Sequence, residues 1–171
     1  MSRGLGDVYK RQNKNTAIHY AKGCSLTSLD TSGIAEAVEA AKNSEVAVIF
    51  GGSASAALAR DYKSSTCGEG FDLNDLNLTG AQSQLIREVY RTGTPVILVL
   101  VTGKPFVIEW EKNNLPAILV QWYAGEQAGN SIADILFGEV VPSGRLTFSF
   151  PRSTGHLPVY YNLSLIHISE P

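Results

Sequence analysis

Apolar residues along the chain fall into runs and stripes that alternate between the spacing of strands and that of helices. Near-continuous apolar runs at 45–50, 96–101 and 117–122 predict strands that are covered on both faces, as in a parallel sheet. Two further segments, 17–22 and 145–150, alternate polar and apolar residues, which predicts a short edge strand and a final strand. The chain is therefore expected to build a sheet of mostly buried strands.

Stripes with helical spacing stand between these strands. The first, at 34–41, follows Thr31 and Ser32, and either side chain is suited to cap a helix. The third, at 127–137, stops at Gly138, because glycine readily adopts the left-handed conformation that ends helices. Both segments predict helices that cover the sheet.

The second stripe has the clearest boundaries. Thr79 and Gln82 have the spacing of a capping box, and Gly93 follows the last apolar position. The predicted buried face consists of Ala81, Leu85, Ile86, Val89 and Tyr90. Because strand and helix alternate through the chain, the predicted fold class is α/β, a three-layer αβα sandwich with a largely parallel central sheet.

Composition and charge narrow the classes of partner. The 171 residues suit one domain, and a net charge of -2 gives no basic surface for nucleic acid. No apolar run reaches the roughly 20 residues that span a bilayer, so no membrane partner is predicted.

His19, His156 and His167 lack metal-ligand spacing, so no metal or other cofactor is predicted. Cys24 and Cys67 are compatible with a disulfide, a reactive thiol or two inert buried side chains.

The two ends of the chain differ from the rest. Residues 1–12 and 163–171 have no capping, periodicity or turn pattern that connects them to their neighbours. They look like translated adapter read-through and are set aside as non-native extensions. The predicted domain is therefore 13–162.

A loop of about 25 residues, well beyond the usual length, follows the strand predicted at 45–50. It leaves the carboxyl end of a parallel strand, which is the edge of an open α/β sheet where ligands bind. The loop contains Asp61, Glu69 and Asp72, and glycines flank Glu69 on both sides. A carboxylate on such a flexible turn is a candidate general acid or base.

Other chemistries lack their parts. The turn GGSAS at 51–55 does not have the GxGxxG spacing of a dinucleotide-binding loop, and GKP at 103–105 does not end a phosphate-binding loop. Ser55 stands where a serine-hydrolase nucleophile elbow requires glycine. Neither a nucleotide site nor a catalytic serine is predicted.

Several motifs in order give the chain a specific resemblance. They are YAKGC at 20–24, CGEGFD at 67–72, LNLTG at 76–80, TGKP at 102–105, WYAGEQAGNSIADILFG at 122–138, PSGRLTFSFP at 142–151 and LPVYYN at 157–162. The region from 13 to 162 resembles the C-terminal αβα sandwich domain of glycoside hydrolase family 3, which includes β-glucosidases and β-xylosidases.

The resemblance implies a retaining exo-acting β-glycosidase. In that family a preceding barrel domain supplies an aspartate nucleophile, and the loop of this domain supplies the acid/base glutamate, which matches Glu69. The barrel is missing from this chain, so the fragment alone is expected to be inactive. Asp61 stays an alternative acid/base residue because this loop varies in length among family members. The family pattern often has arginine after Asp72, where this chain has Leu73.

Further expectations follow from the same resemblance. The substrate would be a carbohydrate, with Asp72, Trp122 and Tyr123 as candidate binding residues. Trp122 and Tyr123 are expected at the sheet edge that carries the loop, since the strands are parallel. The resemblance alone suggests a periplasmic or secreted protein. The alternative is a non-catalytic carbohydrate-binding or scaffold module of the same fold, which a parent reading frame without a barrel would favour.

Overall fold

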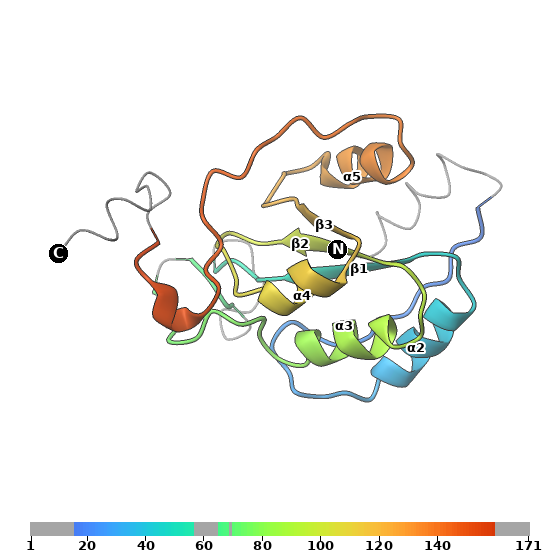
Figure 1. Cartoon of the computed structure of the whole chain (residues 1–171), viewed down its shortest axis with the longest axis horizontal. Coiled ribbons are helices and arrows are strands. Elements are labelled where there is room, and N and C mark those ends of the chain that lie inside the picture. Colours follow the sequence, from blue (N-terminus) through green and yellow to red (C-terminus); the bar gives the residue numbers. More distant parts are fainter. Residues whose placement is uncertain (1–15, 57–64, 69, 160–171) are drawn as a thin grey trace.

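The central sheet is small and entirely parallel. A computed structural model describes residues 16–56, 65–68 and 70–159. The strands are β1 (Ala47–Gly52), β2 (Val96–Val101) and β3 (Ala117–Val120), in the order β1-β2-β3. Both pairs are parallel, so the three carboxyl ends lie at one edge (Figure 1).

Helices cover both faces of this sheet. The α-helices are α2 (Ile34–Lys42), α3 (Gln82–Tyr90), α4 (Glu109–Asn114) and α5 (Ala128–Leu136), and a short 3₁₀ turn, η2, covers Thr154–His156. Figure 1 shows α2, α3 and α4 on one side and α5 on the other. This arrangement confirms the predicted α/β fold with a parallel sheet between helical layers.

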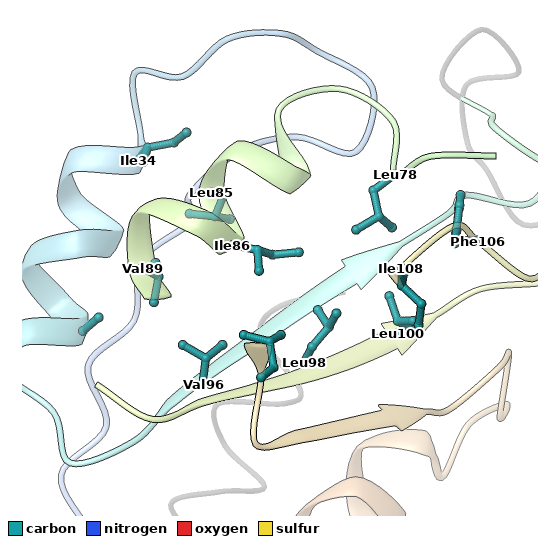
Figure 2. Packing of buried hydrophobic residues seen from close by; sticks show 12 residues of the cluster. Ile34, Leu78, Leu85, Ile86, Val89, Val96, Leu98, Leu100, Phe106 and Ile108 are labelled. Carbon is teal, nitrogen blue, oxygen red and sulfur yellow. The ribbon is translucent and has the colours of Figure 1, made fainter. Parts of the chain in front are cut away.

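The main core lies between the sheet and the α2–α3–α4 layer (Figure 2). Alternate residues of β2 supply Val96, Leu98 and Leu100, all fully buried. Helix α3 contributes its apolar stripe from above, including Ile86, which is 1% exposed. Removing this apolar area from water is the main force that fixes the strands under the helices.

Two predicted strands are wrong. Residues 17–22 form no strand, and Tyr20 is 68% exposed. Residues 145–150 form no strand either, with Phe148 59% exposed. Alternation makes a segment suitable for a half-buried strand, but a ladder also needs a partner strand, and β1 and β3 pair only with β2 among the described residues.

The run predicted at 45–50 is a strand, but one of its faces is not fully covered. Its bounds in the structure are Ala47–Gly52, and Val48 remains 38% exposed. The reason is position, because β1 lies at the edge of the sheet, while β2 lies between two neighbours. The prediction of cover on both faces therefore holds better for the central strand.

The predicted helices are present, and Gly93 and Gly138 follow two of them in the predicted left-handed conformation, with φ of 82° and 78°. The predicted side-chain caps at the N-termini are absent. No side chain caps α2, since Gly33 precedes it and the Ile34 amide donates to the Thr31 carbonyl at 3.0 Å. The predicted capping box of α3 is also wrong, because no side chain caps this helix and the side chain of Gln82 bonds to the end of β1. Gln82, only 3% exposed, accepts from the Gly52 amide at 2.7 Å and donates back to the Gly52 carbonyl at 3.0 Å.

Sequence patterns also missed one helix and misjudged one strand end. Helix α4 occupies the connection around Trp110, whose six residues are too few for a clear stripe. Strand β3 ends at Val120 and not at the predicted Trp122. Trp122 has a φ of 56°, which is incompatible with extended backbone.

Gly52, the last residue of β1, is expected to be the most sensitive glycine of the sheet. It has a φ of 137°, and an added Cβ would lie 2.0 Å from the carbonyl oxygen of Val101. Gly52→Ala should lower the free energy of unfolding by more than about 3 kcal/mol in urea titrations. Gly93→Ala is the matched control, because Gly93 has a φ of 82° with nothing within 4 Å, and should cost about 1 kcal/mol. Equal losses would contradict this account of the strand end.

Candidate functional site

Three strand ends carry polar side chains to one edge of the sheet. Ser53 follows β1 directly, Thr102 follows β2 directly, and Tyr123 comes shortly after β3. Cys67 and Lys104 reach the same edge through hydrogen bonds to these residues. We call Ser53, Cys67, Thr102, Lys104 and Tyr123 the Tyr123 cluster.

The hydroxyl of Tyr123 is the centre of this cluster. It donates to the carbonyl oxygen of Ser53 at 3.1 Å and lies 2.9 Å from Ser53 Oγ and 3.0 Å from Cys67 Sγ. Ser53 Oγ lies 2.9 Å from Thr102 Oγ1, which joins the ends of β1 and β2. The tyrosine ring lies over Gly103, where an added Cβ would be 2.7 Å from Cε2. A single aromatic side chain thus links all three strand ends.

The segment 65–68 runs alongside residues 54–56. The amides of Thr66 and Cys67 donate to the Ala54 carbonyl at 2.8 and 3.2 Å, and the Ala56 amide donates to the Cys67 carbonyl at 2.9 Å. These bonds form a short parallel bridge. The bridge holds residues 65–68 of the long loop against the residues that begin it.

Lys104 ties the same segment to the turn after β2. Its ammonium group donates to the carbonyl oxygen of Thr66 at 2.5 Å, and Thr102 Oγ1 donates to the Lys104 carbonyl at 2.8 Å. Burial lowers the pKa of the Lys104 ammonium group. The bond to Thr66 joins the turn after β2 to the segment 65–68.

Trp122 carries backbone strain at this edge. Its φ of 56° lies in the left-handed region, which is uncommon for a bulky residue. Its ring meets Phe148 edge to face, with centroids 5.8 Å apart and planes at 66°. Strain of this kind is held in place by its surroundings and is frequent at binding and catalytic sites.

The predicted site residues fall into two groups. Glu69 and Asp61 lie outside the described residues. Asp72 is described and is exposed. Trp122 and Tyr123 lie at the edge where β1 ends, and the bonds from Tyr123 to Ser53 and Cys67 confirm that predicted location. Their roles, and that of Asp72, in binding sugar remain predictions.

The two cysteines are free thiols. Cys67 is buried, and Cys24 is half-buried, so that desolvation raises the pKa of the Cys24 thiol. This outcome removes the disulfide from the three possibilities that the sequence left open.

In the described part of the chain, no three or more His, Cys, Asp or Glu side chains form a group that could hold a metal ion. No helix in that part is long and apolar enough to cross a membrane.

The phenol of Tyr123 should give the fold a distinctive alkaline pH dependence. Burial and the bond to Cys67 raise its pKa to about 12. Because the pKa of this phenol is higher in the folded state than in the unfolded state, its contribution to the stability of the fold is fully present below the unfolded pKa of about 10. That contribution is lost as the pH rises through the folded pKa.

We therefore expect the free energy of unfolding of the wild-type chain to fall relative to that of Tyr123→Phe between about pH 10 and pH 12. Urea titrations of both chains across this range measure the difference. The other tyrosines and lysines are common to both chains, so their titration cancels. If the difference in the free energy of unfolding between the two chains did not change with pH, the raised pKa of Tyr123 would be contradicted.

Ser53, Thr102 and Lys104 were not among the predicted site residues. A signal for two of them was present, because Ser53 and Thr102 are the first polar residues after apolar parallel strands. Such positions meet at the carboxyl edge of the sheet. Lys104 has no comparable signal, since its contact with Thr66 depends on how the loop folds back.

Comparison with known proteins identifies the family. The profile described as "Glycosyl hydrolase family 3 C-terminal domain" matches residues 3–170. A β-xylosidase from Formosa agariphila is 43% identical over 157 residues, which cover 92% of this chain and 20% of that protein. A periplasmic β-glucosidase from Salmonella typhimurium is 44% identical over 131 residues, which cover 75% of this chain and 16% of that protein. The chain thus spans a fifth or less of the length of these two relatives.

Solved structures agree with the sequence comparisons. A β-glucosidase from Erythrobacter marinus has a TM-score of 0.75 at 34% identity, over 92% of this chain and 23% of that chain. A β-glucosidase from Listeria innocua in complex with glucose has a TM-score of 0.71 at 34% identity, over 82% of this chain and 18% of that chain. The parallel sheet, the helical layers and the matching sequence together place the chain in glycosyl hydrolase family 3, as its C-terminal domain.

Proposed function

We propose that this chain is part of a retaining, exo-acting β-glycosidase of the β-glucosidase or β-xylosidase type. In this proposal Glu69 is the general acid/base, and a preceding barrel domain supplies the carboxylate nucleophile. The observation that carries it is the similarity to a β-xylosidase over 92% of the chain, which includes the segment around Glu69.

The geometry at the sheet edge supports this role. The segment 65–68, which directly precedes Glu69, is hydrogen-bonded to residues 54–56 at the carboxyl end of β1. Ligands of open α/β sheets bind at this edge. A carboxylate joined to a fixed segment there is suited to reach a sugar held by a second domain.

The chemistry needs two carboxyl groups with different protonation states. Retaining glycosidases place them about 5 to 5.5 Å apart, so that one attacks the anomeric carbon while the other protonates the departing oxygen. The second group then removes a proton from water, which releases the sugar from the enzyme. Each group returns to its initial state at the end of the cycle.

The stereochemistry of the first product tests the proposal. In the full-length protein that contains this chain, proton NMR of aryl β-glucoside and β-xyloside hydrolysis should show the β-anomer first, with the α-anomer appearing only by slow mutarotation. Immediate α-anomer would show inversion and rule out the retaining mechanism. A parent protein that binds sugars without hydrolysing them would favour a non-catalytic module.

A further inference from the structure

The connection between α5 and η2 exposes several apolar side chains close together. Residues 138–148 are all exposed, and Figure 1 shows this stretch running along the outside of the fold without helix or strand. Its large apolar residues are Val140, Val141, Leu146 and Phe148, which are 51%, 84%, 58% and 59% exposed. We call residues 140–148 the exposed segment. A single exposed apolar residue is ordinary, but a group of them marks an interaction surface.

The backbone of this region is also without internal partners. From residue 141 to residue 150, no backbone amide donates to a backbone carbonyl among the described residues. The sequence of 145–150 nevertheless alternates polar and apolar residues, as in a strand with one covered face. Apolar side chains and free backbone groups that lie together are suited to contact a further part of a protein.

Both ends of the exposed segment are fixed to the fold. The Val140 amide donates to the carbonyl oxygen of Asp134 in α5 at 3.2 Å, and Phe150 packs against the main core. Between them, the Phe148 ring meets Trp122 with centroids 5.8 Å apart. Trp122 lies at the carboxyl edge of the sheet, next to Tyr123. The exposed segment is therefore a preformed surface that borders the edge where ligands of such sheets bind.

We propose that the exposed segment is the docking surface for the domain that supplies the nucleophile, and that it seats on an apolar surface of that domain. The inference rests on one element of the proposed function, the presence of this further domain in the parent protein. The similarity to the β-xylosidase covers 92% of this chain, the exposed segment included, but only 20% of that protein. Most of such a chain is thus available to cover the segment.

The composition of the exposed segment agrees with this occupant. Arg145 is its only charged residue, and it donates only to the carbonyl oxygens of Ser143 and Gly144. The centres of interfaces are depleted in charged residues and enriched in aromatic residues and arginine. A neighbour that shares the ligand edge would meet this surface and the substrate together.

The test measures how fast a maleimide labels single cysteines in the full-length parent protein. Val141→Cys should react at least about tenfold more slowly than Leu29→Cys in the folded protein, and the two should react alike in urea. Leu29 is the matched control, because it is an apolar residue that is 81% exposed in this domain, against 84% for Val141. Val140→Cys should be protected as well. Peptide mapping by mass spectrometry separates these labels from those on Cys24 and Cys67.

A charge at the same position supplies a second readout. In the full-length protein, Val141→Asp should lower kcat/KM at least about tenfold for good and poor leaving groups alike, because a misplaced domain affects every substrate. Leu29→Asp should stay within about twofold of wild type. Since Val141 is 84% exposed in this domain, a loss at this position reports on the neighbouring domain.

The outcomes separate the docking surface from the proposed function. Equal labelling rates at positions 141 and 29 in the folded parent, or full activity of Val141→Asp, would overturn the docking surface. Protection of Val141→Cys that disappears when the parent is diluted to a monomer would assign the segment to a second copy and overturn it too. Protection that persists in a monomeric parent without glycosidase activity would support the docking surface and reject the proposed function.

Discussion

Glu69→Gln in the full-length protein should reduce kcat/KM for glycosides with poor leaving groups by about 10² to 10⁴-fold. Such substrates depend on a proton delivered to the departing oxygen, which glutamine cannot supply. The leaving groups of activated aryl glycosides depart as stable anions, so these substrates should lose much less in the glycosylation step. Steady-state rates over a series of aryl leaving groups measure the effect as a steeper dependence on leaving-group pKa.

Two matched variants make this result specific. Asp61→Asn removes the alternative acid/base residue, and Asp72→Asn removes the charge of the nearby exposed aspartate. Neither should steepen the dependence on leaving-group pKa. If Asp61→Asn steepens it and Glu69→Gln lowers every rate equally, the acid/base role belongs to Asp61 and Glu69 has a binding or structural role.

The isolated 171-residue chain should show no turnover of aryl β-glycosides above the uncatalysed rate. A retaining mechanism needs a nucleophile as well as an acid, and one carboxylate cannot both form and hydrolyse a glycosyl-enzyme intermediate. Release of nitrophenol from the purified chain measures this, with the full-length protein as the positive control.

Turnover by the isolated chain that Glu69→Gln abolishes would contradict this prediction. It would mean that the nucleophile also lies within these residues. Turnover that persists in the Glu69→Gln chain would point to a contaminating enzyme. Circular dichroism of both chains excludes unfolding as the reason for inactivity.

The strand that the sequence predicted best is the central one, β2. Strand β2 was predicted at its observed bounds, because an unbroken apolar run stands between Pro95 and Thr102 and a central strand is buried on both faces. The segments 17–22 and 145–150 were wrong because alternation describes a face and not a pairing partner. A local sequence pattern does not show which other strand a segment would pair with.

The same distinction applies to the site. Parallel strands brought Tyr123 to the loop edge, as the sequence predicted. The hydrogen bonds of its hydroxyl group to Ser53 and Cys67 could not be predicted. These partners are separated from Tyr123 by 70 and 56 positions in the sequence. Gln82 shows the same effect, because its capping-box spacing was less decisive than its buried contact with Gly52, 30 positions away.

The product that the full-length Glu69→Gln protein forms in the presence of azide tests the central claim most directly. Azide can attack the glycosyl-enzyme intermediate without help from a general base, so activated aryl glycosides should give a β-configured glycosyl azide at a rate that rises with azide concentration. NMR of the product identifies its configuration. Absence of any glycosyl azide, or its formation by Asp61→Asn and not by Glu69→Gln, would contradict the assignment of Glu69 as the acid/base residue.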